Sequence, residues 1–301
     1  MALPEKEIKP AVSILNLNSR FDRLLVSDTI RNGGVVGAQT ITVGLWVDTT
    51  NPAGVAEINR IKGRNPNSRL ALMVPELEGI IEIIDYDRVD PQLHSIIQNP
   101  QEFSHRISGK SLVKIPVKPH SKYHGCDLTP HLDPDNEGGW LLFLHFGKVH
   151  PNAQKLVEEL YQHSGLIAAT SMNKSGRPTI TGLAEAIDFC SQAGIPYFMK
   201  DPIDPFTDRR GSYPLIAIGK PGEILPKQQI TLKQSVNLLR PQSNLQEEHI
   251  YFLWPEVYPT QKKPLAEILP SIFFQLAANR TAPELLVTVY SLAKDALKTR
   301  S

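Results

Sequence analysis

The chain has 301 residues, of which 41% are hydrophobic and 21% charged, and this composition is typical of a globular protein with a substantial core. Its formal net charge of +1 argues against a protein that holds nucleic acid mainly by bulk charge, although a local basic groove is compatible with it. The two cysteines make no disulfide framework, the charged first ten residues do not resemble a signal peptide, and no apolar run approaches the length of a membrane span, so we expect a cytoplasmic protein without a membrane partner.

Strand-like and helix-like segments alternate along the chain up to about residue 220, which favours an α/β sheet with helices on its faces. Helices are predicted where apolar residues recur at helical spacing, and strands where β-branched or alternating apolar residues lie between turn residues. The predicted helices are 21–31, 52–61, 76–84, 91–97, 152–163, 181–193, 265–277 and 283–297. The predicted strands are 35–47 (one strand or two), 70–74, 110–117, 140–146, 166–170, 196–199, 213–218, 224–230 and 248–254.

Two cations, Lys62 and Arg64, follow the predicted helix 52–61. Cations suit the negative end of the helix dipole, and Gly63 between them can stop the helix, so this pattern has an explanation that involves no ligand. The alternative is that both cations face an anionic ligand. The local sequence leaves these two explanations open.

The predicted strand 110–117 contains Pro116, which cannot donate a backbone hydrogen bond, so an edge position in the sheet is favoured. Residues 118–139 are poor in apolar residues and rich in Pro, Gly, Asp and His, which predicts a long surface loop or an insertion. This segment holds four residues of types that bind zinc, although their spacing fits no compact zinc finger: His120, His124, Cys126 and His131. A solvated loop without a metal is the other interpretation, and we favour it.

The stretch 166–180 carries most of the functional information. A buried strand is expected to end at Thr170, a polar turn to span residues 171–176, and a helix to begin at Thr181. Such turns expose backbone N–H groups near a helix start and can hold anions. Ser171 and Asn173 alternate, so their side chains would leave an extended backbone on the same face. The alternative is an ordinary loop whose Ser and Asn cap the next helix.

The pattern of the sequence changes after about residue 230, and two amphipathic helices are predicted near the C-terminus. We expect residues 231–301 to form a small helical extension or an element that binds a protein partner. Helices that pack on the same core are the alternative.

Taken together, three pieces of this chain resemble the YrdC-like family of threonylcarbamoyl-adenylate synthases, with a divergent pattern. The first runs from Gly33 to Leu45, the second is Lys62-Gly63-Arg64, and the third is Ser171-Met172-Asn173 followed by Ser175-Gly176. The family's signature is a Lys-x-Arg and a Ser-x-Asn that are far apart in sequence and together in the fold. The resemblance covers about residues 20–230.

The resemblance implies a twisted mixed α/β sheet with helices on its faces and a concave, positively charged cavity. It implies an N-terminal arm at 1–20, a nucleotide-binding domain at 21–230 and the C-terminal extension at 231–301. Members of the family convert ATP, threonine and bicarbonate into threonylcarbamoyl-adenylate and pyrophosphate for the modification of adenosine 37 in certain tRNAs. ATP is thus an expected substrate, with Mg²⁺ as its expected companion and no metal site on the chain itself.

Nine side chains are expected at the site through this resemblance. Lys62 and Arg64 would be catalytic, because phosphoryl chemistry needs positioning and neutralisation of negative charge. The remaining residues would bind the nucleotide and the other substrates: Thr40, Thr42, Ser171, Asn173, Ser175, Ser212 and Lys227.

Several positions depart from the family's pattern. Gln39 replaces a Pro, Ile41 replaces an acid, and Pro226 replaces a late Arg, with Lys227 next to it. The family's Arg-x-Pro after the middle strand appears as residues 145–151, without the Arg. We therefore consider two further hypotheses beside the enzyme. One is a catalytically degenerate protein that binds a nucleotide, a tRNA or a double-stranded RNA. It would do so through the four residues of the two signature motifs, Lys62, Arg64, Ser171 and Asn173. The other is a chance resemblance in an unrelated α/β protein.

Overall fold

The computed structural model describes residues 11–40, 42–66, 68–135, 137–163, 165–202, 212–240 and 253–254. The helices expected at 265–277 and 283–297, and nearly all of the strand expected at 248–254, lie outside these residues. Within them, every helix is too short or too polar to cross a membrane.

A mixed sheet forms the centre of the described chain. Its main path has the order β1-β11-β2-β3-β10-β4-β9-β5-β12-β15, and β8 pairs with β9 beside this path. These strands are β1 (Ser13–Asn16), β2 (Val36–Gln39), β3 (Val43–Asp48), β4 (Ala71–Met73), β5 (Leu112–Val117), β8 (Asp133–Asp135), β9 (Gly138–Leu144), β10 (Ile167–Ser171), β11 (Tyr197–Lys200), β12 (Leu215–Ile218) and β15 (Val236–Arg240). Two small hairpins accompany the sheet: β6 (Lys122–Tyr123) with β7 (Cys126–Asp127), and β13 (Ile224–Leu225) with β14 (Ile230–Thr231).

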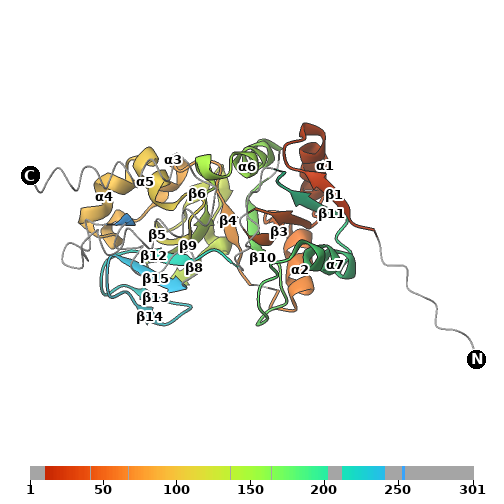
Figure 1. The fold of residues 1–301 in the computed structure, drawn as a ribbon. Helices are drawn as coiled ribbons and strands as arrows, with labels where there is room; N and C mark the ends of the chain where they lie inside the picture. The colour runs from red at the N-terminus through yellow and green to blue at the C-terminus, as the bar shows by residue number, and fades with distance from the viewer. Residues whose placement is uncertain are drawn as a thin grey trace, which may run out of the picture.

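Helices cover both faces of the sheet. They are α1 (Arg20–Arg31), α2 (Pro52–Lys62), α3 (Glu78–Ile83), α4 (Pro91–Ile97), α5 (Pro100–Ile107), α6 (Pro151–His163) and α7 (Leu183–Ala193), with short 3-10 turns η1 (Tyr86–Arg88), η2 (Thr129–His131) and η3 (Gly147–Val149). In Figure 1, α1, α2 and α7 surround β3, β10 and β11 at one end of the molecule, and α3 to α5 lie at the other end.

Three helices begin with the same local signal. Asn51, Asp90 and Asn99 each stand before a proline at the first helical turn, and each side chain accepts a hydrogen bond from a backbone N–H of that turn. An Asn or Asp cap satisfies an otherwise unpaired N–H, and proline there loses no bond. The sequence-based interpretation found the first two of these helices and missed α5.

Alternate residues of each strand enter two cores on opposite faces. Leu45 and Leu72 pack in the core that contains apolar residues of α2, α3, α4, α5 and α7. Trp46 and Met73, their neighbours in sequence, pack with α1 and α6. This alternation follows from the two-residue period of a strand. The expectation of an α/β sheet with helices on both faces is confirmed.

The expectation that strand 110–117 lies at an edge is wrong. β5 lies between β9 and β12 and is buried along nearly its whole length. The register explains how Pro116 is tolerated, because β12 pairs only with Leu112, Val113 and Lys114 and stops before the proline. No neighbouring strand on that side therefore needs the missing N–H.

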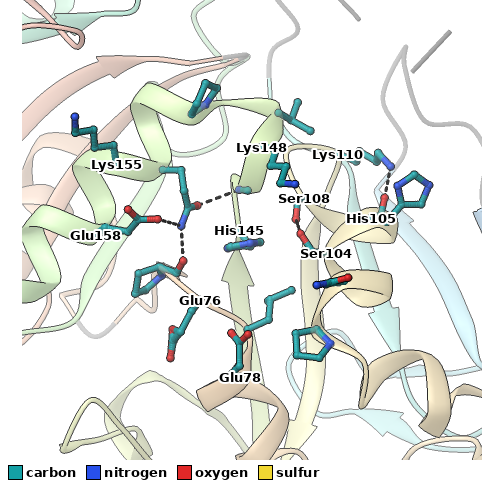
Figure 2. Close-up of a pocket in the computed structure, with 18 residues that line it drawn as sticks. Glu76, Glu78, Ser104, His105, Ser108, Lys110, His145, Lys148, Lys155 and Glu158 are labelled. Atoms are coloured by element: carbon teal, nitrogen blue, oxygen red, sulfur yellow. Dashed lines mark hydrogen bonds between the residues drawn. The ribbon is translucent and has the colours of Figure 1, made fainter. Parts of the chain in front are cut away.

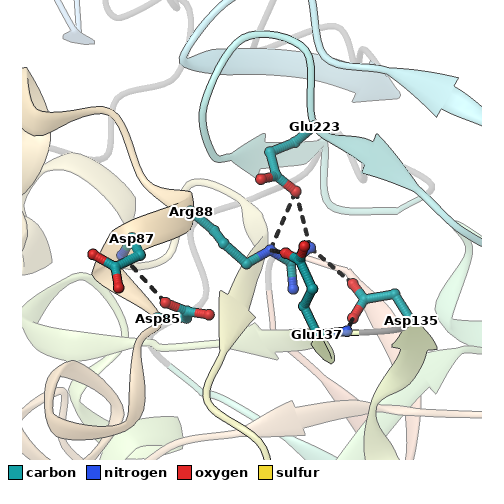
Figure 3. A network of polar contacts seen from close by, with 6 residues as sticks. All are labelled: Asp85, Asp87, Arg88, Asp135, Glu137 and Glu223. Atoms are coloured by element: carbon teal, nitrogen blue, oxygen red, sulfur yellow. Dashed lines mark hydrogen bonds and ion pairs between the residues drawn. The ribbon is translucent and has the colours of Figure 1, made fainter.

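The segment 118–139 is folded onto the sheet through buried apolar side chains, Tyr123, Leu128 and Leu132. A buried arginine then ties it to the β13–β14 hairpin. Arg88 is 5% exposed, and its Nη2 lies 2.8 Å from the Asp135 carboxylate and 3.0 Å from the Glu223 carboxylate (Figure 3). This network fixes the hairpin against the end of β8.

Candidate functional site

The turn after α2 meets the turn after β10. Gly63 caps α2 in a left-handed conformation, with φ of 60°, and its N–H donates to the carbonyl of Arg60 at 3.0 Å. The N–H of Ser175 donates to the carbonyl of Lys62 at 2.8 Å. The helix-ending role of Gly63 is therefore observed, and the same turn also reaches a segment distant in sequence.

The Lys62 side chain joins the two predicted motifs directly. Its Nζ donates to Asn173 Oδ1 at 2.9 Å and to the carbonyl oxygen of Ser171. An ammonium group carries three protons, so one proton is left for a further acceptor. The structure thus brings Lys62, Ser171 and Asn173 together at the end of β10.

Hydrogen bonds hold the Ser171 and Asn173 side chains in place. Ser171 Oγ donates to Asn173 Oδ1 at 2.7 Å, which agrees with the expectation that both side chains share a face. Asn173 Nδ2 donates to the carbonyls of Arg177 at 2.6 Å and Lys174 at 3.0 Å. Neither residue caps the next helix, because α7 starts at Leu183 behind Gly182 and has no side-chain cap. The capping alternative is therefore wrong.

Burial controls the charge of this site. Lys62 is 4% exposed, and this burial, assisted by the nearby Arg64 charge, lowers the pKa of its ammonium to about 7. Burial also lowers the pKa of the Arg64 guanidinium from its ordinary value. Burial penalises the isolated charge of the ammonium, so a bound anion would stabilise its charged form.

Arg64 is held from behind by Asn59. Its Nε donates to Asn59 Oδ1, and its backbone N–H donates to the Asn59 carbonyl at 3.1 Å. Its Nη2 is buried without a hydrogen-bond partner among the described residues. Arg64 therefore lies near Lys62 with a free donor but makes no direct bond to Ser171 or Asn173 in the described structure.

Thr40 and Thr42 lie in the β2–β3 turn beside this site. The backbone register pairs Gly44 with Ser171, and the N–H of Met172 donates to the carbonyl of Val43 at 3.0 Å. Both threonines are buried, and Thr40 Oγ1 lies 3.5 Å from the hydroxyl of Tyr213. Ser212 precedes Tyr213 in the chain, so the Thr40 contact brings this segment toward the same end of β2 and β3.

Lys227 belongs to a neighbouring cluster of charges around Asp133. Lys114 Nζ lies 2.5 Å from Asp133 Oδ2 and donates to Gln228 Oε1 at 2.8 Å, and the Lys227 charge acts on both members of this pair. Among the described residues, no hydrogen bond or ion pair connects Lys227 with Lys62, Ser171 or Asn173.

Two cations that contact Asp133, Arg69 and Lys114, were not predicted from the sequence. Arg69 Nη1 lies 3.3 Å from Asp133 Oδ1. Arg69 stands two residues before β4, whose Ala71 pairs with Ala169 of β10. One signal was present in the sequence, since Lys114 interrupts the apolar pattern of β5.

The histidines and the cysteine of segment 118–139 do not assemble a metal centre. No group of three or more His, Cys, Asp or Glu side chains suited to a metal ion occurs in the described part of the chain. His124 stacks edge-on against Tyr123 and Tyr161, whereas His131 faces Thr49. The zinc interpretation of this segment is therefore not supported.

Comparison with known proteins gives a family model, Sua5_yciO_yrdC, described as telomere recombination, that matches residues 28–130. No curated protein matches the chain by sequence. The structure of P. abyssi Sua5 complexed with L-threonine is similar, with a TM-score of 0.54 and 20% identity over 82% of this chain and 62% of that chain. E. coli YciO has a TM-score of 0.55 and 13% identity over 77% of this chain and 96% of that chain.

A hypothetical protein from Streptococcus mutans UA159 is similar to the same degree, with a TM-score of 0.55 and 14% identity over 82% of this chain and 95% of that one. These identities establish likeness of fold. The chain spans less than two thirds of the Sua5 chains that it matches, 63% and 62% of their lengths.

Proposed function

This chain belongs to the Sua5/YciO/YrdC family, and from that premise we propose that it forms L-threonylcarbamoyl-AMP and pyrophosphate from ATP, threonine and bicarbonate. The observation that carries this proposal is the bond from Lys62 Nζ to Asn173 Oδ1 at 2.9 Å, which joins the two signature motifs in one place. The threonine bound in the structure of P. abyssi Sua5 supports the amino-acid substrate.

The proposed reaction has two steps. Bicarbonate and the threonine amine give a carbamate and water. A carbamate oxygen then attacks the α-phosphorus of ATP, a new P–O bond forms, and the bond to the leaving pyrophosphate breaks. Negative charge accumulates on the phosphate oxygens, so fixed cations and hydrogen-bond donors stabilise the transition state.

Each site residue is proposed to have the role in this reaction that suits its chemistry. The free proton of Lys62 and the free Nη2 of Arg64 donate to phosphate or carboxylate oxygens. The Ser171–Asn173 pair holds Lys62 in position. The remaining proposed binding groups are Thr40, Thr42, Ser175, Ser212 and Lys227.

Mg²⁺ usually keeps several waters and is bound through one or two carboxylates and the phosphates of its substrate. The described residues contain no group of three acidic or histidine side chains that would hold it alone. We therefore propose that the ion arrives with ATP. A cytoplasmic location and the use of the product in tRNA modification belong to the same proposal.

The test is incubation of the full chain with ATP, Mg²⁺, threonine and labelled bicarbonate. We expect pyrophosphate release that depends on threonine and a labelled adenylate product. Lys62→Ala should abolish most of this release, whereas Lys233→Ala, an exposed lysine at the other end of the sheet, should not change it. Pyrophosphate release that does not depend on threonine, or that persists in the Lys62→Ala variant, would contradict the proposal.

A second candidate is a protein that binds a nucleotide or RNA without this chemistry. Two observations favour it. Asn173 already uses Oδ1 and Nδ2 in bonds within the chain, and Arg64 Nε already donates to Asn59. Calorimetric titration with ATP, with and without threonine, separates the two candidates. Binding of ATP that threonine does not alter, together with absent pyrophosphate release, would favour the second.

A further inference from the structure

An open groove of about 880 Å³ lies beyond the carboxyl end of β4, whereas the candidate site lies toward its start. Figure 2 shows the side chains that line this groove. Ser171 is opposite the residues that precede β4, whereas this groove is lined by the residues that follow β4 and β9. Its walls come from the loop before α3, from α5, and from the first two turns of α6. The groove is therefore separate from the site proposed above.

The sheet topology explains why a crevice forms here. β4 and β9 are parallel neighbours, with Leu72 paired to Phe143 and Met73 to Leu144. The chain leaves β4 toward α3, which packs in one core, and leaves β9 toward α6, which packs in the core on the other face. Adjacent parallel strands whose connections diverge in this way leave a crevice beyond their carboxyl ends, where ligands bind in α/β proteins.

His145 forms the floor of this groove with a fixed tautomer. It is 8% exposed, and its Nδ1 lies 3.0 Å from the carbonyl oxygen of Val74, which can only accept a hydrogen bond. Nδ1 therefore carries the proton, and Nε2 of the neutral ring is an acceptor. Burial lowers the pKa of His145, which keeps the ring neutral near pH 7.

Opposite charges stand on the two sides of His145 in Figure 2, with Glu78 below it and Lys148 above it. Both side chains are exposed, and neither has a hydrogen bond or an ion pair among the described residues. The other two carboxylates of the groove are engaged: Glu76 accepts from the Tyr123 hydroxyl at 2.7 Å, and Glu158 accepts from Gln154 at 3.1 Å.

A pair of hydroxyls lies beside Lys148. Ser104 Oγ and Ser108 Oγ are 2.7 Å apart, so one hydroxyl donates to the other and the second has a proton left for a ligand. The groove thus presents an anion-binding side, made of Lys148 and these serines, and a cation-binding side, made of Glu78 and His145 Nε2.

We propose that this groove binds a small zwitterion that carries a primary ammonium and a carboxylate, such as a free amino acid. The ammonium would lie between the Glu78 carboxylate and His145 Nε2, and the carboxylate would accept from Lys148 and from the serine pair. A polyanion would be repelled by the three glutamates of the groove, and a polycation by its three lysines.

The test is calorimetric titration of the full chain with a panel of free amino acids, and with methylammonium and acetate as separate halves of the ligand. We expect at least one amino acid to bind about tenfold or more tightly than either half, because both charges must be paired at once. Equal binding of a half-ligand, or no binding by any member of the panel, would overturn the proposal.

Variants locate the binding. Glu78→Gln and Lys148→Gln should each weaken it about tenfold. Two controls should leave it unchanged: Glu82→Gln, one turn further along α3, and Lys233→Gln, an exposed lysine between β14 and β15. Binding that persists in Lys62→Ala but falls in Lys148→Gln belongs to the groove. Binding lost only in Lys62→Ala belongs to the site of the proposed reaction and would reject the groove.

Discussion

Lys62 at the end of α2 and Asn173 after β10 share a hydrogen bond of 2.9 Å between Nζ and Oδ1. The same oxygen accepts from Ser171 Oγ at 2.7 Å, and Lys62 is 4% exposed. A buried ammonium is thus stabilised by uncharged oxygens in place of a carboxylate. Its positive charge remains available to an anionic ligand, which a salt bridge would have neutralised.

We predict that Asn173→Ala lowers the free energy of unfolding by about 1–3 kcal/mol, because it removes a charge-assisted acceptor from a buried ammonium. Lys62→Met should remove the need for that acceptor. The double variant should then lose less stability than the two single variants lose together, and the difference, the coupling energy, should be about 0.5–3 kcal/mol. Urea unfolding of the four proteins measures the cycle. Lys174→Ala, at the exposed next position, serves as control, and strictly additive effects would contradict the prediction.

ATP binding should weaken as the pH rises from about 6 to 8.5. The pKa of Lys62 in the free protein is about 7, so the fraction of charged ammonium falls through this range, and with it the attraction for phosphate. Bound phosphate favours the protonated form, so binding near pH 7.5 should take up protons. Calorimetry in buffers of different ionisation enthalpy measures this uptake. Lys62→Arg should bind with little pH dependence, and an equally steep dependence in that variant would argue against Lys62 as the titrating group.

Arg88 is predicted to be a strong contributor to stability. It is 5% exposed, contacts Asp135 and Glu223, and lies with its guanidinium carbon 5.3 Å from the centroid of the Trp140 ring. Arg88→Gln would leave two carboxylates without their partner, at a cost of about 3–5 kcal/mol. Arg60→Gln, which breaks an exposed pair with Glu57, should leave the free energy of unfolding nearly unchanged.

Hydrogen exchange gives a second readout for Arg88. Its carbonyl accepts from the N–H of Lys220 at 2.8 Å, so loss of the network should increase exchange in the β13–β14 hairpin before the rest of the sheet. An Arg88→Gln protein with unchanged stability and unchanged protection of this hairpin would show that the network is dispensable.

The Lys114–Asp133 pair should behave differently when it is broken than when it is replaced. Lys114 is 1% exposed in the middle of β5, so Asp133→Ala leaves a buried cation beside Arg69 and Lys227 and should cost about 3–5 kcal/mol. The double variant Lys114→Met, Asp133→Leu should recover most of this loss, because it leaves no buried lysine charge to compensate. Thermal and urea unfolding compare the two. A double variant no more stable than Asp133→Ala would contradict this account.

Local signals predicted most of the helices and strands. Asn51-Pro52 and Asp90-Pro91 marked two helix starts, and the alternation in residues 110–117 marked β5. The helix α5 was missed although Asn99-Pro100 carries the same signal, because it follows α4 after only two residues. The edge position of β5 was a wrong prediction, because the length of β12, and not the presence of Pro116, decides whether a missing N–H matters.

The sequence by itself determined where the backbone would turn, cap and alternate, since such preferences depend on residues within a few positions of one another. It pointed to Lys62 with Asn173 through resemblance to a family. Only the tertiary structure decided that Arg69 and Lys114 lie against Asp133, and that His145 faces a groove beyond the carboxyl end of β4. The physical reason is that these neighbours are set by the pairing of strands distant in the chain, and each strand carries the same apolar pattern whichever partner it has.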